Sequence, residues 1–249
     1  MFKKVQFYLA LYKRFGIRSL RFLVIAKFKK DELINIRIPG FKTTIRLSNF
    51  TTDVTTLFQI FFAGEYNITL DKAPKFIIDC GANIGLSAVY FAHQYPTAMV
   101  IAIEPDAENF KYLIQNTLAY PNVHCIRKAI WPRMAQLEIV DPGTGNWGLQ
   151  TRELSHASIA SVDAITLDAI LIQWQIKKID LLKIDIEGAE KELFSSNHAG
   201  WLSKTAVMTI ELYDFFDPTI SPVFEAAIAP YHFTKYYLGE NLVCKSPLL

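Results

Sequence analysis

The chain has 249 residues, of which 51% are hydrophobic and 20% charged, a composition that supports one full-sized core and excludes a disordered protein. Its formal net charge of +2 is uneven, because residues 1–30 hold nine lysines and arginines and no acid, whereas the remainder holds 17 bases and 24 acids. The three cysteines lie far apart without a C-x-x-C pair, which excludes a zinc signature or a disulfide framework and fits a reducing cytoplasm.

The basic segment, residues 1–30, is predicted to form an amphipathic helix that is broken near Gly16. Apolar residues recur between the bases at helical spacing, at Phe7, Leu11, Phe15, Leu20, Leu23 and Val24. The longest apolar run, 22–26, is too short to cross a bilayer, and no signal-peptide cleavage site follows it. The pattern favours a helix that packs on the domain with a solvated basic face, and peripheral contact with an anionic membrane is the alternative.

Residues 34–73 are predicted to complete this N-terminal extension with a β-hairpin and a helix. Residues 34–38 and 44–47 alternate between apolar and polar side chains, and Pro39-Gly40 supplies the turn between them. Residues 53–66 place several apolar side chains on one side of a helix. We therefore divide the chain into an extension, 1–73, and a main domain, 74–249.

From residue 74 onward, short apolar strands alternate with amphipathic helices, which is typical of a parallel sheet covered on both faces. Strands are predicted at 75–79, 99–104, 123–127, 179–184 and 207–212, and helices at 84–94, 107–119, 166–174 and 188–195. Two final strands, 232–238 and 242–245, form an antiparallel hairpin around residues 239–241. The prediction is a mostly parallel, seven-stranded α/β sheet that ends in an antiparallel hairpin, unlike the usual dinucleotide-binding fold.

The first strand of this domain runs into a glycine-containing loop, D-C-G-A-N-I-G at 79–85, and then into a helix. Ligands of open α/β sheets bind at the carboxyl ends of strands, and glycine lets the backbone approach a ligand closely. Asp79 can accept hydrogen bonds from an ammonium group, and Glu104, at the end of the second strand, can accept them from both hydroxyls of a ribose. Cys80 is better explained as a small residue that ends a buried strand than as a nucleophile, because no base stands at a recognisable spacing.

Two cofactor classes are compatible with an acid at Glu104. Nicotinamide-dependent oxidoreductases use a G-x-G-x-x-G loop, whereas Ala82-Asn83-Ile84 separates only two glycines in this chain. Pyrophosphate needs the close approach at the helix N-terminus that the extra glycines permit, but a cofactor with an amino-acid tail and no phosphate does not. The loop therefore favours S-adenosylmethionine, and an NAD(P)-dependent oxidoreductase is the alternative.

A second polar cluster, L-K-I-D-I-E-G-A-E at 182–190, follows the fourth strand and faces the same crevice. Acids at the start of a helix complement its dipole, which accounts for Glu187 and Glu190. It does not account for Lys183 and Asp185, which lie in an otherwise apolar strand, and buried charges usually pair or do chemistry. We expect Asp185 to leave the strand toward the cofactor and Glu187 to begin the next helix.

These residues together resemble the FkbM-type methyltransferase family, from about residue 44 to 212. The resemblance is carried by residues 76–85, Glu104-Pro105, Lys128-Ala129, Leu167-Asp168, the I-D-L-L-K-I-D-I-E-G-A-E string at 179–190 and Ile210-Glu211. Before the first strand, Ile45-Arg46, Asp53 and Gly64-Glu65-Tyr66 also look like the family. It implies a class I methyltransferase (Rossmann-like) fold and S-adenosylmethionine-dependent methylation of a hydroxyl, commonly on a sugar or another small metabolite.

The resemblance also implies a set of cofactor contacts. Those it names are Asp79, Gly81, Asn83, Gly85 and Glu104, with Ala129 near the adenine. The neighbouring residues of the predicted cofactor site are Ala82, Leu86, Ser87, Pro105 and Asp185. Many related enzymes place an acid or amide after the third strand to bind the adenine amino group. This chain has Lys128-Ala129-Ile130 there, so backbone groups must serve.

An alcohol is a poor nucleophile until it is deprotonated, so methyl transfer is helped by a base near the methyl group. Asp185 is the first candidate and Glu187 the second, with Lys183 as a charge partner and Glu211 also directed toward the crevice. His156 lies in the long connection 141–161 and is a further candidate, although a single loop histidine is more often just exposed.

Two alternatives concern the same acids. Asp185 and Glu211 could hold a magnesium ion, but no third ligand is apparent, so no metal is predicted. The fold could persist as a non-catalytic binding module, against which the intact acids argue.

The expected partner is a small-molecule or glycan acceptor. Nucleic acid is not expected, because the only basic stretch is residues 1–30 and the body of the chain is acidic. The eighteen phenylalanines are compatible with a self-association surface and hence with a homo-oligomer. The expected location is cytoplasmic, with residues 1–30 as the segment that could contact a membrane.

Overall fold

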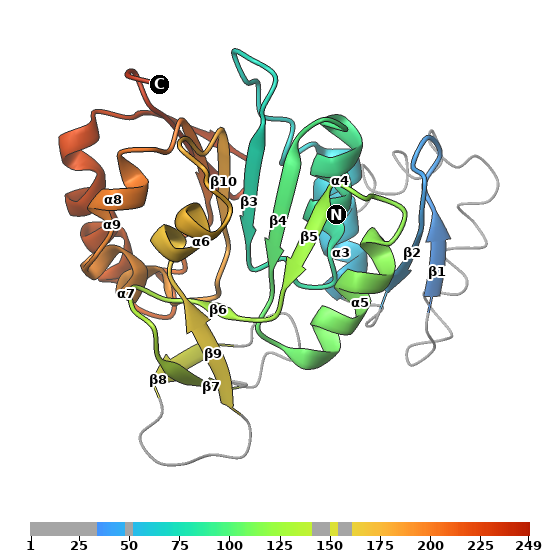
Figure 1. Cartoon of the computed structure of the whole chain (residues 1–249), viewed down its shortest axis with the longest axis horizontal. Coiled ribbons are helices and arrows are strands. Elements are labelled where there is room, and N and C mark those ends of the chain that lie inside the picture. The colour runs from blue at the N-terminus through green and yellow to red at the C-terminus, as the bar shows by residue number, and fades with distance from the viewer. Residues whose placement is uncertain (1–33, 48–51, 141–149, 154–160) are drawn as a thin grey trace, which may run out of the picture.

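The computed structural model describes residues 34–47, 52–140, 150–153 and 161–249, which form three layers with a sheet between two groups of helices (Figure 1). The predicted basic helix in residues 1–30 and the candidate His156 lie outside the described residues. None of the helices within the described ranges is long and apolar enough to cross a membrane.

The central sheet has seven strands, in the spatial order β12 (Thr234–Leu238), β13 (Asn241–Lys245), β11 (Val207–Ile210), β10 (Leu181–Ile184), β3 (Phe76–Cys80), β4 (Met99–Ile103) and β5 (Val123–Ile126). The strands from β11 to β5 are parallel, and β13 is inserted antiparallel between β11 and β12. This confirms the predicted mostly parallel, seven-stranded sheet with its terminal antiparallel hairpin. The strand order reverses between β3 and β10, the place where open α/β sheets bind ligands.

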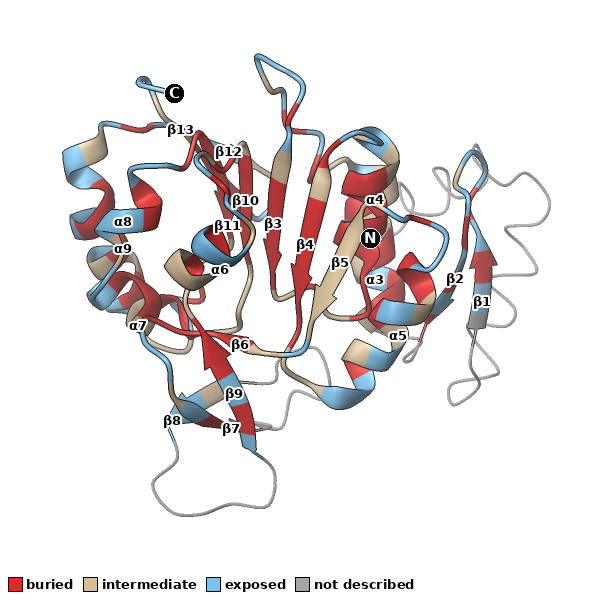
Figure 2. Ribbon diagram, viewed as in Figure 1, coloured by how far each residue is buried: buried red, intermediate tan, exposed pale blue. Residues whose placement is uncertain are grey.

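Both faces of the sheet are buried, which explains why its inner strands are apolar along their whole length (Figure 2). Neighbouring residues of β3 serve opposite faces, because side chains alternate along a strand. Ile77 packs into the core under α4 (Leu86–Gln94) and α5 (Ala107–Thr117). Ile78 packs into the other core, which includes side chains of α6 (Leu167–Gln173), α7 (Glu190–Ser195), α8 (Ala199–Leu202) and α9 (Ile220–Ile228), the last followed by the short turn η2 (Ala229–Tyr231).

Side-chain caps fix where two of these helices begin. The Asp106 carboxylate accepts a hydrogen bond from the Asn109 N–H at 2.8 Å at the start of α5, and the Thr166 hydroxyl accepts one from the Ala169 N–H at 3.0 Å at the start of α6. The first helix of the domain, α4, instead begins directly after Gly85, so the glycine loop leads straight into its N-terminus.

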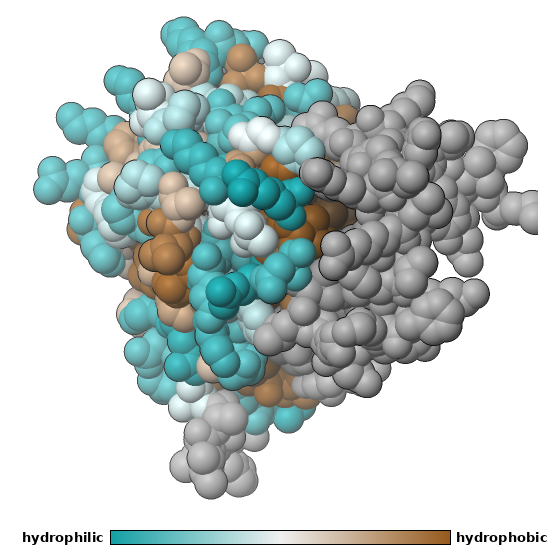
Figure 3. Space-filling view, turned by 90° about the vertical axis from the view of Figure 1, so that its right-hand side faces the viewer, coloured by the Kyte–Doolittle hydropathy of each residue, from teal (hydrophilic) through white to brown (hydrophobic). Residues whose placement is uncertain are grey.

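The predicted N-terminal hairpin is formed by β1 (Ile34–Arg37) and β2 (Thr44–Leu47). The following helix, α3 (Thr52–Phe58), continues as a π-helical turn, η1 (Gln59–Ala63), and ends at Gly64 in the left-handed conformation. The hairpin, α3 and η1 share one hydrophobic core with α4, so the outer side of α4 is covered as well. Where it is described, the surface on this side of the molecule mixes hydrophilic residues with smaller hydrophobic patches (Figure 3).

One buried side chain ties this hairpin to the main domain. Asn116 of α5 accepts a hydrogen bond from the Arg46 N–H at 2.7 Å and donates to the Arg46 carbonyl at 2.9 Å. Its amide also donates to the Ile84 carbonyl in the glycine loop at 2.8 Å. The side-chain amide of Asn116 therefore joins the hairpin, α5 and the glycine loop.

A smaller second sheet was not predicted from the sequence. It has the strand order β6 (Ala129–Ile130), β9 (Ser161–Ile165), β7 (Gln136–Val140) and β8 (Gln150–Glu153). The connection expected at 141–161 thus contains β8, which pairs antiparallel with β7. The figure places this sheet below the central one, next to the carboxyl ends of β3 and β4 (Figure 1).

Candidate active site

Two adjoining cavities lie at the carboxyl ends of β3 and β10. The larger, of about 370 Å³, is lined by α3, η1, the glycine loop, the residues after β10 and β11, and the turn between β12 and β13. The smaller, of about 60 Å³, is lined by the glycine loop, the residues after β4, β6 and Thr151 of β8. Gly81, Asn83, Asp185 and Glu187 line both, so the two cavities meet at these residues.

Glycine is required at two positions of the loop between β3 and α4. Gly81 has φ +78°, and a Cβ at this position would lie 1.7 Å from the carbonyl oxygen of Asp185. Gly85 has φ +88°, and a Cβ there would lie 2.7 Å from a methyl carbon of Leu113. The loop therefore crosses directly against the end of β10 and packs on α5, which leaves its backbone exposed to both cavities.

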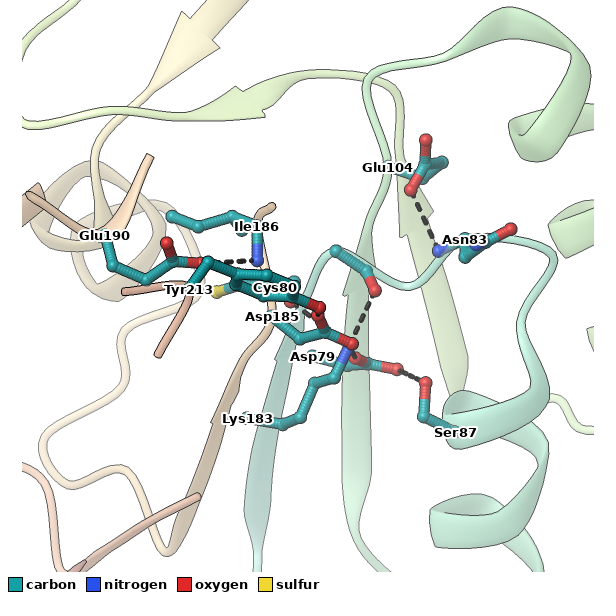
Figure 4. A network of polar contacts seen from close by, with 11 residues as sticks. Asp79, Cys80, Asn83, Ser87, Glu104, Lys183, Asp185, Ile186, Glu190 and Tyr213 are labelled. Atoms are coloured by element: carbon teal, nitrogen blue, oxygen red, sulfur yellow. Dashed lines mark hydrogen bonds and ion pairs between the residues drawn. The ribbon is translucent and has the colours of Figure 1, made fainter. Parts of the chain in front are cut away.

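A chain of buried charges connects β3, β10 and the segment after β11 (Figure 4). The Lys183 ammonium lies 3.4 Å from Asp79 Oδ1 and 3.2 Å from Asp185 Oδ2. The second oxygen of Asp79 accepts a hydrogen bond from the Ser87 hydroxyl at 2.6 Å, and Asp185 Oδ1 accepts one from the Tyr213 hydroxyl at 2.7 Å. The predicted charge partner of Asp185 is thus shared with Asp79.

Lys183 also fixes the glycine loop. Its ammonium donates to the Gly81 carbonyl at 2.6 Å, which joins the end of β3 to β10 beyond the last backbone bond of the sheet. Burial alone would lower the pKa of Lys183, but attraction to Asp185, Tyr66 and Asp79 outweighs it and holds that pKa well above its usual range. Burial raises the pKa of Asp79, and Lys183 opposes this rise. Lys183 therefore stays charged and holds the glycine loop against the end of β10.

Glu104 stands at the smaller cavity, after β4. Its Oε2 accepts a hydrogen bond from the Asn83 N–H at 2.8 Å, and its Oε1 accepts one from the Asp106 N–H at 3.0 Å. Burial raises its pKa to about 7, although these two hydrogen bonds favour the ionised form. A hydrogen bond from the Asn109 side chain also favours the ionised form. A carboxylate can accept about four hydrogen bonds, so the side chain can still accept one from a ligand.

The sequence predicts that Glu187 begins the next helix, and this prediction is wrong, because α7 begins only at Glu190. Glu187 lies in a turn before α7 with φ +56°, followed by Gly188 with φ +100°. Its Oε2 is buried and has no hydrogen-bond partner among the described residues. Burial, followed by repulsion from Asp185, raises the pKa of Glu187 to about 9. An acid in strained backbone with an unpaired oxygen beside a cavity is typical of a functional site.

The strained turn is held by Glu190, the first residue of α7, which is completely buried. One of its oxygens accepts a hydrogen bond from the Ile186 N–H at 3.0 Å (Figure 4). The other accepts one from the Gly188 N–H at 2.9 Å. Both oxygens are thus used to close the turn around Glu187. Glu190 is a positioning residue for its neighbour.

Most of the remaining predicted residues line one of the two cavities, but Gly85 and the fully buried Asp79, which is paired with Lys183, line neither. Ala82, Leu86, Ser87 and Glu211 line the larger one, and Pro105 and Ala129 line the smaller one. Burial, with repulsion from Asp185 next, raises the pKa of Glu211 to about 7. Within the described residues, no group of three or more His, Cys, Asp or Glu is arranged to hold a metal ion.

Several lining residues were missed by sequence reasoning, namely Tyr66, Tyr213, Glu65, Glu240 and Asn241. Part of this set could have been found. β12 runs parallel to β11, so the turn between β12 and β13, with Glu240, lies at the same edge of the sheet as the carboxyl end of β11. Tyr213 stands two residues after Glu211 at that edge. Nothing in the sequence places Tyr66 or Glu65 there, because they come from the separate segment after η1.

A family model for the methyltransferase FkbM domain matches residues 79–229, more than half of the chain. A methyltransferase named sdnD from Sordaria araneosa is 26% identical over 54% of this chain and 65% of its own length. Methyltransferase 1 from Beauveria bassiana is 25% identical, covering 54% of this chain and 63% of its own length. The chain thus spans somewhat less than two thirds of both relatives. The crystal structure of an FkbM methyltransferase from Methylobacillus flagellatus covers 72% of this chain and 45% of its own, with 15% identity and a TM-score of 0.45.

Proposed function

The chain belongs to the FkbM methyltransferase family, and from this premise we propose that it transfers a methyl group from S-adenosylmethionine to a hydroxyl of a small metabolite such as a sugar. The observation that carries the proposal is the pair of adjoining cavities, which meet at the glycine loop and at two acids. One cavity has the features of a cofactor site and the other those of an acceptor site.

The residues at the smaller cavity fit the nucleoside part of this cofactor. The Glu104 carboxylate can accept a hydrogen bond from a ribose hydroxyl, and the backbone beside Ala129 borders the place for the adenine. Gly81 lets the loop cross against the end of β10, which brings the loop backbone to the border of both cavities, where the amino-acid tail would lie. When bound, S-adenosylmethionine supplies a methyl group on a positively charged sulfur.

Two acids at the junction of the cavities are suited to different roles. Both oxygens of Asp185 have partners, Tyr213 on one side and Lys183 on the other. The Oε2 of Glu187 has no hydrogen-bond partner among the described residues, and the positive charge of the cofactor's sulfur would favour the ionised form that a base needs. We therefore assign Glu187 as the base that takes the proton of the acceptor hydroxyl, and Asp185 as the acid that orders Lys183 and the loop.

Calorimetry of the full chain tests the cofactor part of the proposal. We expect S-adenosylhomocysteine to bind and NAD and NADP to give no signal. Glu104→Ala should weaken this binding by ~1–3 kcal/mol, since polar groups of the ligand lose their acceptor in a buried site. The matched control is Glu108→Ala on α5, whose side chain is 66% exposed and, among the described residues, is paired with Lys111 at 3.7 Å.

Two results would contradict the proposal. Binding of NAD that depends on Glu104 would support the oxidoreductase alternative. Equal effects of Glu104→Ala and Glu108→Ala on S-adenosylhomocysteine affinity would place the cofactor elsewhere.

A further inference from the structure

The edge of the central sheet opposite the candidate active site carries a group of lysines. This edge is formed where the parallel strands begin and where the antiparallel β13 ends, on the side away from the second sheet (Figure 1). We call four of its segments, 71–75, 175–180, 203–206 and 245–249, the amino edge. Their charged residues are six lysines and two acids, namely Lys72, Lys75, Lys177, Lys178, Lys204 and Lys245 with Asp71 and Asp180. The side chains of the amino edge therefore carry a net charge of +4.

Contacts between the strands bring these lysines into one row. The Lys75 N–H donates a hydrogen bond to the Asp180 carboxylate at 2.7 Å, and the Ile179 N–H donates one to the Lys204 carbonyl at 2.8 Å. The row continues to β13, because Lys245 is paired with the first residue of β11. Neighbouring strands lie about 4.8 Å apart. Four adjacent strands, β3, β10, β11 and β13, thus present lysines side by side.

Most of this positive charge is not neutralised by the described residues. The fully exposed members of the group are Lys72, Lys75, Lys177 and Lys204. Among the ion pairs of the described residues, a single one involves the group, Lys178 with Asp180 at 3.3 Å. The other oxygen of Asp180 is used by backbone N–H groups at the start of β3. The amino edge therefore offers several lysines to a negatively charged partner.

Exposed apolar side chains lie among these lysines. Ile172, in the last turn of α6, is 78% exposed, and its carbonyl accepts a hydrogen bond from the Gln175 N–H at 3.2 Å in the following segment. Leu248 is 80% exposed, and the carbonyl of the next residue, Leu249, accepts a hydrogen bond from the Lys178 ammonium at 3.1 Å. Moving such side chains out of water is favourable. The surface is therefore suited to a partner with both negative charge and an apolar layer.

The surface of an anionic membrane has both properties. Lysines are attracted to anionic headgroups, and aliphatic side chains can enter the boundary between headgroups and acyl chains. A nucleic acid would also attract the lysines, but single strands are bound by stacking of their bases on aromatic side chains. The four segments of the amino edge contain no aromatic residue. The observations therefore favour a membrane over a nucleic acid.

The opposite edge of the sheet fixes the orientation of such a complex. The residues that line the two cavities there include several acids, Glu104, Asp185, Glu187, Glu211 and Glu240. An anionic surface attracts lysines and not carboxylates, so it selects the amino edge. β3 is five residues long, so the two edges lie about 16 Å apart. A chain bound through its amino edge turns both cavities toward water.

From these observations we propose that the chain binds the surface of an anionic phospholipid membrane through the amino edge. The lysines contact the headgroups, and Ile172 and Leu248 enter the interface beside them. This surface is separate from residues 1–30 and from the candidate active site, so the proposal does not depend on the proposed function. Ligands of the cavities enter from the aqueous side.

The test measures cosedimentation of the full chain with vesicles. We expect binding to vesicles of phosphatidylcholine with phosphatidylserine, little binding to phosphatidylcholine alone, and weaker binding as salt is added. Lys75→Glu/Lys204→Glu should weaken binding about tenfold or more, because each lysine near an anionic surface contributes roughly fivefold in affinity. Ile172→Ser/Leu248→Ser should weaken it several-fold, because less apolar surface leaves water.

The matched control is Lys111→Glu/Arg133→Glu, which changes the net charge equally. These side chains are 60% and 61% exposed, on α5 and in the connection after β6, away from the amino edge. The control should bind vesicles nearly as the unchanged chain does. Thermal melting shows whether each variant is folded, and Lys75→Gln/Lys204→Gln replaces the reversed variant if that one is not.

Four results would overturn the proposal. The full chain could ignore the anionic vesicles at low salt. Lys75→Glu/Lys204→Glu could bind as well as the unchanged chain, which would place the contact elsewhere, for example in residues 1–30. Both charge-reversed variants could lose binding equally, which would make net charge alone responsible. A single-stranded RNA could bind more tightly than the vesicles, with Ile172→Ser/Leu248→Ser unaffected, which would make the partner a nucleic acid.

Discussion

At the scale of single residues, Glu187 and Asp185 differ in what surrounds them, and this difference can be tested by two isosteric changes. Glu187→Gln removes the proposed base, so turnover should fall by ~10²–10⁴-fold while S-adenosylhomocysteine affinity changes little. Asp185→Asn removes one partner of the buried Lys183, so the glycine loop should shift and affinity and turnover should fall together. Turnover is measured as S-adenosylhomocysteine release with a sugar that binds, and affinity by calorimetry.

The opposite pattern would restore the first interpretation of the sequence. If Asp185→Asn abolishes turnover without affecting affinity, and Glu187→Gln remains active, Asp185 is the base.

The sequence identified the residues with useful chemistry but could not rank them. Lys183 and Asp185 stood out because they are charged residues in an apolar strand, and the structure shows both in one ion-pair network. Their ranking depends on partners that are distant in the chain. Tyr213, 28 residues further on, donates to one oxygen of Asp185 and also lies within hydrogen-bonding reach of Glu187, whose Oε2 still has no partner among the described residues. Neither of these contacts can be predicted from the spacing of residues along the sequence.

At the scale of elements, the contact between the glycine loop and β10 can be tested by two substitutions. Gly81 and Gly40 both have positive φ, but they differ in what an added methyl group would meet. Gly81→Ala places a Cβ 1.7 Å from the backbone oxygen of Asp185, which cannot move without breaking β10 from β3. We expect loss of detectable S-adenosylhomocysteine binding and a lower melting temperature. Calorimetry and thermal melting measure the two effects.

Gly40→Ala is the matched control for the backbone conformation. Gly40 has φ +91°, also in the left-handed region, but nothing lies within 4 Å of its Cβ position. It should therefore cost only about 1–2 kcal/mol of stability and leave binding unchanged. If both variants bind the ligand equally well, the contact between the loop and β10 is not needed for the site.

The central sheet could be predicted because each strand carries its own signal, a short apolar run between amphipathic helices. The second sheet could be predicted only in part: β7, Q-L-E-I-V, and β9, S-V-D-A-I, alternate between polar and apolar residues as half-buried strands do, but the two outer strands carry no such signal. β6 has only two residues and β8 reads Q-T-R-E, so neither shows the apolar pattern of a buried strand. β6 forms because it pairs with β9, and β8 forms because it pairs with β7. Such pairing depends on the fold rather than on the local sequence.

At the scale of the whole molecule, several acidic side chains with raised pKa values lie at the carboxyl edge of the sheet. Burial raises the pKa of Glu104 and Glu211 to about 7, of Glu190 to about 8 and of Glu187 to about 9. Acids whose charged form is disfavoured in the folded chain make that state less stable when they ionise. This arrangement suits a site that is completed by positively charged ligands.

The pH dependence of stability follows with a definite sign. Because these folded-state pKa values lie above the ordinary value of 4.5, the folded chain binds more protons than the unfolded chain between pH 4.5 and about 9. The stabilisation is complete below pH 4.5 for these groups and is lost as the pH rises through about 7 to 9. The ligand-free chain should therefore unfold at progressively lower urea concentrations from pH 6 to pH 9.

Glu187 has the highest of these pKa values, so its removal should change the upper end of the window most. Glu187→Gln cannot ionise, and the fall in stability between pH 8 and pH 9 should become shallower, whereas Glu225→Gln at an exposed ion pair should leave the slope unchanged. Urea unfolding of the three proteins at fixed ionic strength measures this directly. A stability that stays constant or rises from pH 6 to pH 9 would show that the acids at this edge are already ionised in the folded chain.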